Sequence, residues 1–450
     1  MNRAMLDYFR CAEALARVQL AGSLSEDSGY FAFGSEIICY GRSSSGFRSK
    51  RVGEPLYDAL ADVQADRGCI RLPMNPDEIV DNLRNERYAC DESRGSTPFG
   101  PGALVRSIYY RLRPFLSVAI RKHLQRVWLR DWNAIPFPRW PVDRTTEQLL
   151  ERILVCVMRA QGLERIPFVW FWPDGAGSCA MMTHDVEQVA GRNFCSQLMD
   201  MDDSFGIKSS FELVPEQRYA IPVALLDEMR NRGFEIGIHD WNHDGDLFSN
   251  HKDFLRRAEQ INAYGRQFGA LGFRSGGLYR NQAWYGALEF SYDMSVPAVA
   301  HLDPQRGGCC SLMPFFVGRI LELPVTTIQD YSLLHILNDY SIDRWKQQLR
   351  EITEHHGLAS FIVHPDYIIE GRARRTYQLL LEHLTQLRST LKVWIALPRE
   401  VDRWWRARNQ MVVVPDGRGW RVEGPGRERA RVAFAALTGD TLAYSVEDNQ

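Results

Sequence analysis

Side chains that could carry chemistry stand in two close pairs. Asp185 and Glu187 are two positions apart, and His239 and His243 form a His-x-x-x-His pair. Two neutral imidazoles and one carboxylate form a ligand set that leaves positions open on zinc or a similar divalent ion for water and substrate. This pattern indicates a catalytic metal site, and the residue types alone leave open which of the two acids holds the metal.

Arg274, Asp293 and His364 add the groups that hydrolysis at such a site needs. Zinc or a similar ion lowers the pKa of its bound water toward about 7, and an ionised Asp185 can take the proton so that the water attacks an amide or ester carbonyl. His364 then protonates the departing amine or alcohol. We expect Arg274 near Asp185 and Asp293 near His364, because a charged neighbour holds each group in the form that its role requires.

Short apolar runs alternate with amphipathic stretches from about residue 165 onward. This alternation predicts parallel strands linked by helices, and the number of strands favours a (β/α) barrel over an open sheet. The expected helices are 222–232, 252–269, 342–356 and 372–388. The expected strands are 178–183, 208–213, 234–239, 271–274, 291–296, 320–325, 358–364 and 391–396.

Nearly all of the candidate residues lie at the carboxyl end of an expected strand. Asp185 follows the first strand, His239 closes the third, Arg274 closes the fourth and His364 closes the seventh, whereas Asp293 falls within the fifth. In a barrel these strand ends meet at one face, where active sites of this architecture lie. Residues far apart in the sequence are therefore expected to converge.

The order and spacing of these residues resemble those of the polysaccharide deacetylases, also called the NodB-homology or carbohydrate esterase family 4 group, over about residues 175 to 400. In the common form of that family the first motif is T-F-D-D, with the first Asp as base and the second as metal ligand. Residues 183–187 are T-H-D-V-E, which is closer to a variant whose ligand lies two positions after the base. The resemblance implies that Asp185 is the base and Glu187 a metal ligand.

The second and third motifs are matched to different degrees. His239 and His243 match the H-x-x-x-H motif, which implies that both are metal ligands. The R-x-P-x-G motif is matched only at Arg274, because Gly276 stands in place of Pro and Leu278 in place of Gly. In the family this Arg orients the base, and that role carries over to Arg274.

The remaining family roles fall on three further residues. A backbone N–H in the third motif helps to bind the oxyanion, and this role would fall on Gly277. Asp293 resembles the fourth-motif acid that pairs with the catalytic His. The L-x-x-H motif is present as 361–364 with Phe361 in place of Leu, which makes His364 the catalytic His.

The resemblance implies a distorted (β/α) barrel and a hydrolase of carbon–nitrogen bonds other than peptide bonds. The substrate would be an acylated, above all N-acetylated, amino sugar in a glycan, a glycolipid or a cytoplasmic precursor. The cofactor would be a divalent metal, with Zn²⁺ first and Ni²⁺ or Co²⁺ as alternatives. A catalytically degenerate barrel that binds saccharide without turnover is the other interpretation, because Val186 and the residues around Gly276 depart from the family motifs.

A different hydrolase class is suggested by the His-Asp doublets at 184–185 and 239–240. In His-Asp phosphohydrolases this doublet lies within a helical bundle. Both doublets here follow apolar runs of the β type, which argues against that class.

Outside the barrel the sequence divides into two further regions. Residues 1–165 mix helical and β patterns and form an N-terminal α+β region of unassigned role, and 166–404 form the barrel. Residues 405–450 contain short β-type segments at 411–415, 419–423, 430–436 and 441–446, which indicates a small β appendage.

The segment 104–132 is basic, with Arg and Lys interleaved among apolar residues at roughly helical spacing. It could lie on an anionic membrane surface, at the inner face of the membrane. The alternative, which we favour, is a helix packed on the barrel with a solvated basic face. The basic residues are Arg106, Arg111, Arg113, Arg121, Lys122, Arg126 and Arg130.

The composition is that of an ordinary globular protein, 45% hydrophobic and 24% charged, with a formal net charge of −2. This balance gives no support for nucleic-acid binding. The nine cysteines have irregular spacings and include no C-x-x-C pair, which fits a reducing compartment. The first 22 residues lack the apolar stretch of a signal peptide, so we expect a cytoplasmic protein.

Overall fold

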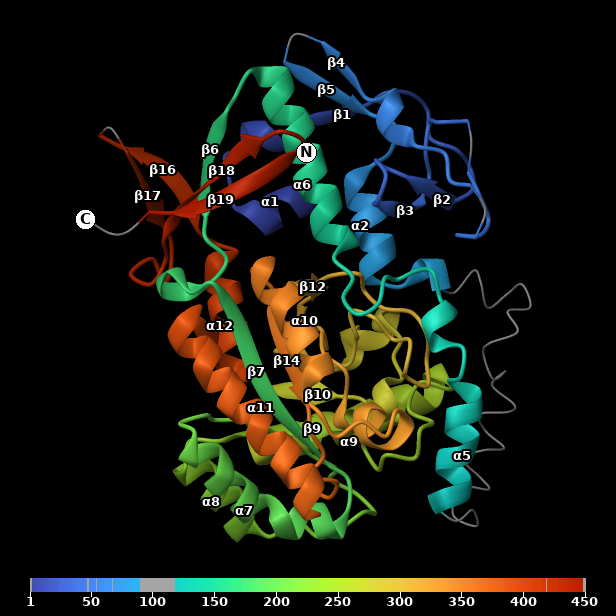
Figure 1. Cartoon of the computed structure of the whole chain (residues 1–450), viewed down its shortest axis with the longest axis vertical. Coiled ribbons are helices and arrows are strands. Elements are labelled where there is room, and N and C mark those ends of the chain that lie inside the picture. Colours follow the sequence, from blue (N-terminus) through green and yellow to red (C-terminus); the bar gives the residue numbers. More distant parts are fainter. Residues whose placement is uncertain are drawn as a thin grey trace.

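The computed structural model describes residues 2–46, 48–53, 55–66, 68–89, 118–417 and 419–447. Figure 1 shows two lobes, one above the other. The upper one, called here the terminal lobe, contains elements from both ends of the chain. The lower one, called the barrel lobe, contains β7 to β15.

A curled sheet of nine strands forms the barrel lobe. Its order is β12-β13-β11-β10-β9-β8-β7-β14, and β15 pairs with the first part of β7. Along this path only β12 and β13 are antiparallel. The expected distorted (β/α) barrel is therefore confirmed. The strands are β7 Ser178–Val186, β8 Ser210–Leu213, β9 Glu235–His239, β10 Gly272–Arg274, β11 Tyr292–Asp293, β12 Phe315–Val317, β13 Ile320–Glu322, β14 Leu358–Ile362 and β15 Val393–Ile395.

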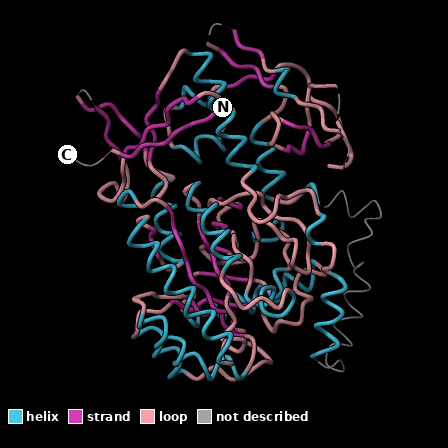
Figure 2. Tube along the Cα trace, viewed as in Figure 1, coloured by secondary structure: helices cyan, strands magenta, loops and turns pink. Residues whose placement is uncertain are grey.

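Helices pack around the sheet, as the cyan segments around the magenta strands show in Figure 2. Each is amphipathic: α11 buries Leu380, Leu381 and Leu384, while Arg375 and Glu382 form an ion pair on its exposed side. The four expected helices are confirmed to within a few residues at their ends. The helices are α7 Val189–Ser204, α8 Val223–Asn231, α9 His251–Phe268, α10 Asp343–Glu354, α11 Gly371–Thr390 and α12 Pro398–Arg408.

Threonine side chains join the two ends of the curled sheet. Thr326, which follows β13, donates from its hydroxyl to the Leu358 carbonyl at 2.6 Å and accepts from the Ser360 N–H at 2.9 Å. The Thr327 hydroxyl donates to the Ser360 carbonyl at 2.7 Å. These bonds fix the segment that leads to Asp330 against β14.

The core of the barrel lobe contains acids. Glu212 of β8 occupies the space beside Gly237 of β9, where an added Cβ would lie 1.6 Å from Glu212 Oε2. Glu235 of β9 accepts a hydrogen bond of 2.6 Å from the Tyr292 hydroxyl. Burial raises the pKa of Glu212 and of Glu235 to about 7. Because the Glu212 carboxylate fills the space where a Cβ would lie, position 237 accepts only a residue without a side chain.

Both ends of the chain build the terminal lobe. The strand β18 Val432–Thr438 pairs with β19 Thr441–Val446 on one side and with β6 Arg165–Val169 on the other, both antiparallel. Phe9 packs against Phe168 and Tyr444 at ring-centroid distances of 5.7 and 6.4 Å. The other elements of this lobe are α1 Arg3–Phe9, η1 Glu13–Ala16, β1 Val18–Leu20, β2 Gly29–Ala32, β3 Ile38–Gly41, η2 Ala59–Asp62, β4 Gln64–Asp66, β5 Cys69–Leu72, α2 Pro76–Arg84, α6 Thr145–Gln161, β16 Val412–Asp416 and β17 Gly419–Glu423.

The basic segment 104–132 lies partly outside the described residues, which resume at 118. Its helix α5 Val118–Trp128 stands at the edge of the barrel lobe in Figure 1. Arg126 donates from Nε and Nη2 to the carbonyl of His335, in the short helix η8 Ser332–Ile336, at 3.1 and 3.0 Å. In the described part of the chain, no helix combines the length and apolar character that crossing a bilayer requires.

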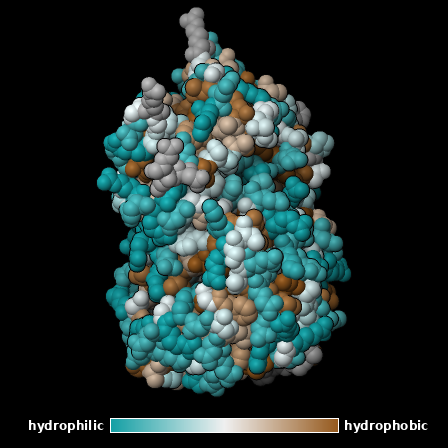
Figure 3. Space-filling model, turned by 60° about the vertical axis from the view of Figure 1, so that its left-hand side comes forward, coloured by the Kyte–Doolittle hydropathy of each residue, from teal (hydrophilic) through white to brown (hydrophobic). Residues whose placement is uncertain are grey.

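The face of the molecule in Figure 3 is mainly hydrophilic, with apolar residues in small separate areas. Scattered apolar residues are normal on a surface that contacts water. This face therefore presents scattered apolar residues and not one large apolar area.

We expect Glu212→Gln to reduce the dependence of stability on pH. The folded-state pKa of Glu212 is about 7 against an ordinary value of 4.5, so this carboxyl stabilises the fold fully below pH 4.5 and loses that contribution as the pH rises through 7. The complete loss is ~3 kcal/mol for one such group, and the Gln variant does not undergo it. Denaturant unfolding between pH 5 and pH 8 measures the two slopes.

The matched control is Glu259→Gln on the exposed side of α9, which should keep the wild-type slope. Equal slopes for Glu212→Gln and wild type would show that Glu212 does not titrate as a buried acid.

Candidate active site

The strand ends bring most of the candidate residues to one place. Asp185 lies near the end of β7 and His239 at the end of β9, with His239 Nε2 3.7 Å from Asp185 Oδ2. His364 follows β14 by two residues, and its Nε2 lies 3.3 Å from Glu187 Oε1. These four side chains are buried. The convergence expected for a barrel is therefore present in the structure.

Glu187, His239 and His243 form a compact ligand cluster. Glu187 Oε1 lies 2.9 Å from His243 Nε2 and 3.7 Å from His239 Nε2. One ligand atom from each residue lies within 4.8 Å of the other two. Within the described chain this is the one group of His, Cys, Asp and Glu side chains with such spacing.

The donor atoms of this cluster fit a divalent metal. Nε2 of His239 and Nε2 of His243 are buried, neither makes a well-directed hydrogen bond, and both lie near the same Glu187 oxygen, at 3.7 and 2.9 Å. His239 Nδ1 lies 3.2 Å from the carbonyl of Arg274, so a proton on Nδ1 leaves the Nε2 lone pair free. Unpartnered imidazole nitrogens facing a carboxylate are the environment that zinc and similar ions require.

Asp185 is held by a buried guanidinium. Arg274 Nη1 donates to Asp185 Oδ1 at 2.6 Å and to the Thr183 hydroxyl oxygen at 2.8 Å. Burial by itself would raise the pKa of the Asp185 carboxyl, but neighbouring positive charge, above all that of the Arg274 guanidinium, outweighs it and holds the pKa below its usual value. The expected pairing of Asp185 with Arg274 is found, and it keeps Asp185 ionised.

The partner of His364 is Asp330, which corrects the expected pairing with Asp293. Asp330 Oδ1 lies 2.7 Å from His364 Nδ1, and Asp330 Oδ2 accepts the His364 N–H at 2.7 Å. Burial would lower the pKa of the His364 imidazole, but Asp330 and Glu187 raise it well above its usual value. His364 is thus kept protonated by an acid that the sequence reasoning missed.

Asp293 contacts Ser295, two residues farther along the chain, and interacts with Glu322 of β13. Its carboxylate accepts the Ser295 N–H at 3.0 Å and the Ser295 hydroxyl at 2.8 Å, and the Ser295 hydroxyl oxygen accepts the Ser275 N–H at 2.9 Å. Burial and the neighbouring Asp293 charge raise the pKa of Glu322 well above its usual value. Asp293 therefore supports the loop after β10 rather than His364.

The loop after β10 contains the short helix η6 Gly276–Leu278 and contacts the ligand cluster. The Gly276 N–H donates to Asp240 Oδ2 at 3.2 Å, and an added Cβ on Gly276 would lie 3.0 Å from the His243 ring. Asp240 and His243 both have left-handed backbone angles, with φ of 59° and 56°. Asp240 thus joins two loops, and strained residues gather at the site.

Aromatic rings cover His364 on one side. The Tyr367 ring stacks on the His364 imidazole with centroids 4.6 Å apart at 30°, and Tyr331 lies 5.7 Å from Tyr367. The Tyr331 hydroxyl donates to the side-chain oxygen of Gln125 in α5. Helix α5 is therefore connected to the wall of the site.

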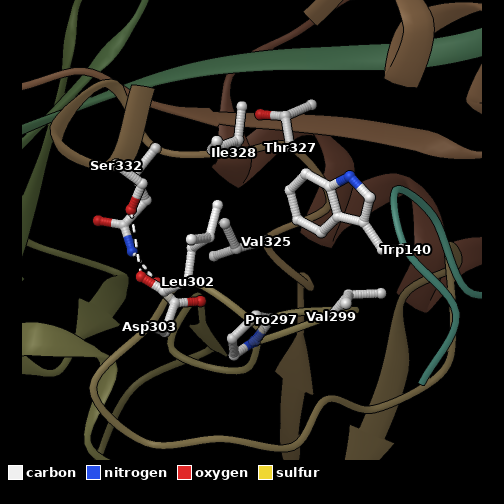
Figure 4. Close-up of a pocket in the computed structure, with 10 residues that line it drawn as sticks. Trp140, Pro297, Val299, Leu302, Asp303, Val325, Thr327, Ile328 and Ser332 are labelled. Atoms are coloured by element: carbon white, nitrogen blue, oxygen red, sulfur yellow. Dashed lines mark hydrogen bonds between the residues drawn. The ribbon is translucent and has the colours of Figure 1, made fainter. Parts of the chain in front are cut away.

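A small pocket adjoins the segment that carries Asp330. Trp140 and Val325 both line it (Figure 4). Gln329 Nε2 donates to Asp303 Oδ1 at 2.6 Å. Burial raises the pKa of Asp303 to about 6. The lining is mainly apolar and includes no candidate site residue. The pocket therefore lies beside the 325–332 segment and is separate from the candidate active site.

Comparisons with known proteins give similarity in structure alone. No protein-family model matches the sequence, and no curated protein sequence matches it significantly. A protein from Mycobacterium smegmatis assigned to the polysaccharide deacetylases is 16% identical, with a TM-score of 0.43 over 53% of this chain and 93% of that one. Puue allantoinase is 13% identical, with a TM-score of 0.39 over 52% and 92%.

A protein from Pseudomonas aeruginosa PAO1, assigned to the same class as the first, is 13% identical, with a TM-score of 0.40 over 52% of this chain and 93% of that one. The solved structures to which this chain is similar thus include members of the class that its motifs resemble.

Proposed function

We propose that this chain is a metal-dependent hydrolase that removes an acyl group, above all an N-acetyl group, from an amino sugar in a glycan, a glycolipid or its cytoplasmic precursor. It would then act on carbon–nitrogen bonds other than peptide bonds. One observation carries the proposal: the buried Nε2 atoms of His239 and His243 converge on one Glu187 oxygen, beside an Arg-paired acid and an Asp-paired imidazole.

Glu187, His239 and His243 would hold the metal. When bound, a divalent ion supplies a Lewis acid that polarises the acyl carbonyl and acidifies a water molecule. Asp185 accepts a proton from the attacking water, and Arg274 keeps this carboxylate ionised and fixes its orientation. Asp185 is the base rather than a ligand in this scheme because its Oδ1 is already engaged by the guanidinium.

The second half of the reaction falls to His364 and to the loop after β10. The protonated imidazole donates its Nε2 proton to the departing nitrogen, while Asp330 holds Nδ1 and orients the ring. We assign the oxyanion contact to the Gly277 N–H, because Gly277 is the half-buried residue of an otherwise buried turn, has φ of 60°, and follows Gly276, which packs on His243. The rings of Tyr367 and Tyr331 would form the wall against which the sugar lies.

We further propose that α5, which packs on the barrel lobe through Arg126, presents its outer side to an anionic membrane surface at the cytoplasmic face, so that a lipid-linked substrate reaches the site. Residues 103–130 contain seven Lys and Arg and no Asp or Glu. Leu124 and Val127, three positions apart on α5, are 44% and 49% exposed. Basic charge with exposed apolar side chains on one helix favours anionic lipid.

Metal content distinguishes the hydrolase from a barrel that only binds saccharide. Wild type reconstituted with zinc, nickel or cobalt should retain about one ion per chain, and His239→Ala should lose it because a ligand is missing. His251→Ala, on the exposed start of α9, is the matched control and should retain the ion. A wild type without metal after reconstitution excludes the hydrolase and favours the saccharide-binding barrel.

Turnover rates of two variants show whether Asp330 or Asp293 is the catalytic partner of His364. Asp330→Asn should lower kcat for acetate release from N-acetylated hexosamine oligomers by ~10²-fold or more, because His364 loses its charged partner. Asp293→Asn should stay within ~10-fold of wild type, since Asp293 acts on the loop through Ser295. The reverse order of the two effects would restore Asp293 as the catalytic partner.

Co-sedimentation with vesicles tests the membrane surface. Wild type should bind vesicles that contain anionic lipid at low salt, lose binding as salt rises, and ignore neutral vesicles. A variant with Leu124→Asp and Val127→Asp should bind weakly, whereas Val223→Asp, at a 69% exposed site on α8, should bind as wild type does. Wild type that ignores anionic vesicles at low salt rules this surface out.

A further inference from the structure

The terminal lobe reaches into the barrel lobe through the residues that follow α2. Gln282 Nε2 donates to the Arg84 carbonyl at 3.1 Å, and the Tyr88 hydroxyl donates to the Gly308 carbonyl at 2.6 Å. Glu86 lies between these two contacts in the sequence, with a left-handed φ of 54°. A non-glycine residue adopts this conformation at a cost, which the surrounding contacts must offset.

Glu86 forms a buried contact between the terminal lobe and the loop after β10. Its carboxylate accepts Arg280 Nε at 2.6 Å, Arg280 Nη2, and the Gly308 N–H at 2.6 Å. The side chains of Arg280 and Glu86 are 0% and 7% exposed. A buried guanidinium that makes a two-pronged contact with a carboxylate is fixed in both position and orientation.

Arg280 transmits this restraint to the turn that faces the ligand cluster. Its Nη1 donates to the Leu278 carbonyl at 2.8 Å. Leu278 and Gly277 have successive left-handed angles, with φ of 54° and 60°. Two such residues in a row are unfavourable when one of them carries a side chain, so the turn needs an external contact to hold it.

The other end of the same turn touches a metal-ligand candidate. The Gly276 N–H donates to the Asp240 carboxylate. The Cα of Gly276 faces the His243 ring, and an added Cβ would lie 3.0 Å from it. The path from Glu86 to His243 therefore runs through Arg280, the Leu278 carbonyl and the backbone of residues 276–278, which lies beside the His243 ring. A shift of Arg280 would move the turn against the site.

We infer that Glu86 is a positioning residue for the turn at 276–278, so that the terminal lobe completes the active site of the barrel. This inference rests on the proposed function for its catalytic meaning. Glu86 acts through Arg280 and the Leu278 carbonyl, and it does not touch the reacting atoms. The terminal lobe thereby gains a role in the reaction.

The experiment compares Glu86→Gln with Glu151→Gln in the full-length protein. Glu151 also lies in the terminal lobe and pairs with Arg144 at 3.0 Å, remote from the turn, so it controls for loss of an ion pair. Hydrogen exchange of the peptide 275–281 measures the order of the turn, and metal content and the kinetics of acetate release are measured in parallel.

For Glu86→Gln we expect exchange in 275–281 to rise ~10-fold or more, with the remaining barrel peptides unchanged. Metal content should stay at the wild-type level. We expect kcat to fall ~10-fold or more with KM within ~2-fold, because a displaced turn weakens contacts made in the transition state more than contacts made to the bound substrate. Glu151→Gln should change none of these quantities. Arg280→Lys, which keeps the charge but not the two-pronged contact, should give an intermediate exchange rate.

Two results would overturn the inference. One is exchange in 275–281 that is equal to wild type in Glu86→Gln, or in Arg280→Lys if the first variant does not fold. The other is exchange that rises across the whole barrel lobe together with a lower Tm, which marks Glu86 as a general lobe contact. A wild type that neither holds metal nor releases acetate refutes the proposed function, while the exchange of 275–281 still decides whether Glu86 positions the turn.

Discussion

Arg274, whose guanidinium is buried at the carboxyl ends of the strands, links its own strand to three other parts of the barrel. Arg274 of β10 donates to Asp185 of β7 at 2.6 Å and to the carbonyl of Met294, just past β11, at 3.0 Å, and its own carbonyl lies 3.2 Å from Nδ1 of His239 on β9. A buried charge needs a close partner, so Arg274 and Asp185 fix each other and the strands that carry them. The same contacts keep the base ionised and orient one imidazole of the ligand cluster.

The period of an extended strand accounts for the unusual first motif. Side chains two positions apart on a strand point to the same face, so Thr183, Asp185 and Glu187 all face the site while Val186 is fully buried. The extra methylene of Glu lets its carboxylate reach His243 at 2.9 Å from a position just past the strand end. The two acids are therefore not adjacent in the sequence, yet Glu187 still reaches the imidazoles as a ligand while Asp185 stays paired with Arg274 as the base.

The sequence predicts the barrel and most of the site because strand ends converge in this architecture. It does not predict Asp330, because this acid lies five residues past the apolar run 320–325 and reaches His364 through a turn fixed by Thr326 and Thr327. The contact of Glu86 with Arg280 spans 194 positions, and no local pattern carries information about such a pair. Periodicity specifies elements and faces, whereas partner choice across long separations depends on packing that only the folded chain reveals.

The most direct test of the account is the position of a metal in the folded protein. Anomalous diffraction at the zinc absorption edge, from crystals of zinc-loaded wild type, locates the ion relative to both acids. The account predicts one peak at about 2.0 to 2.2 Å from Nε2 of His239, Nε2 of His243 and a carboxylate oxygen of Glu187, with Asp185 still paired to Arg274. A peak coordinated by Asp185 instead of Glu187, or no peak between the two imidazoles, would contradict it.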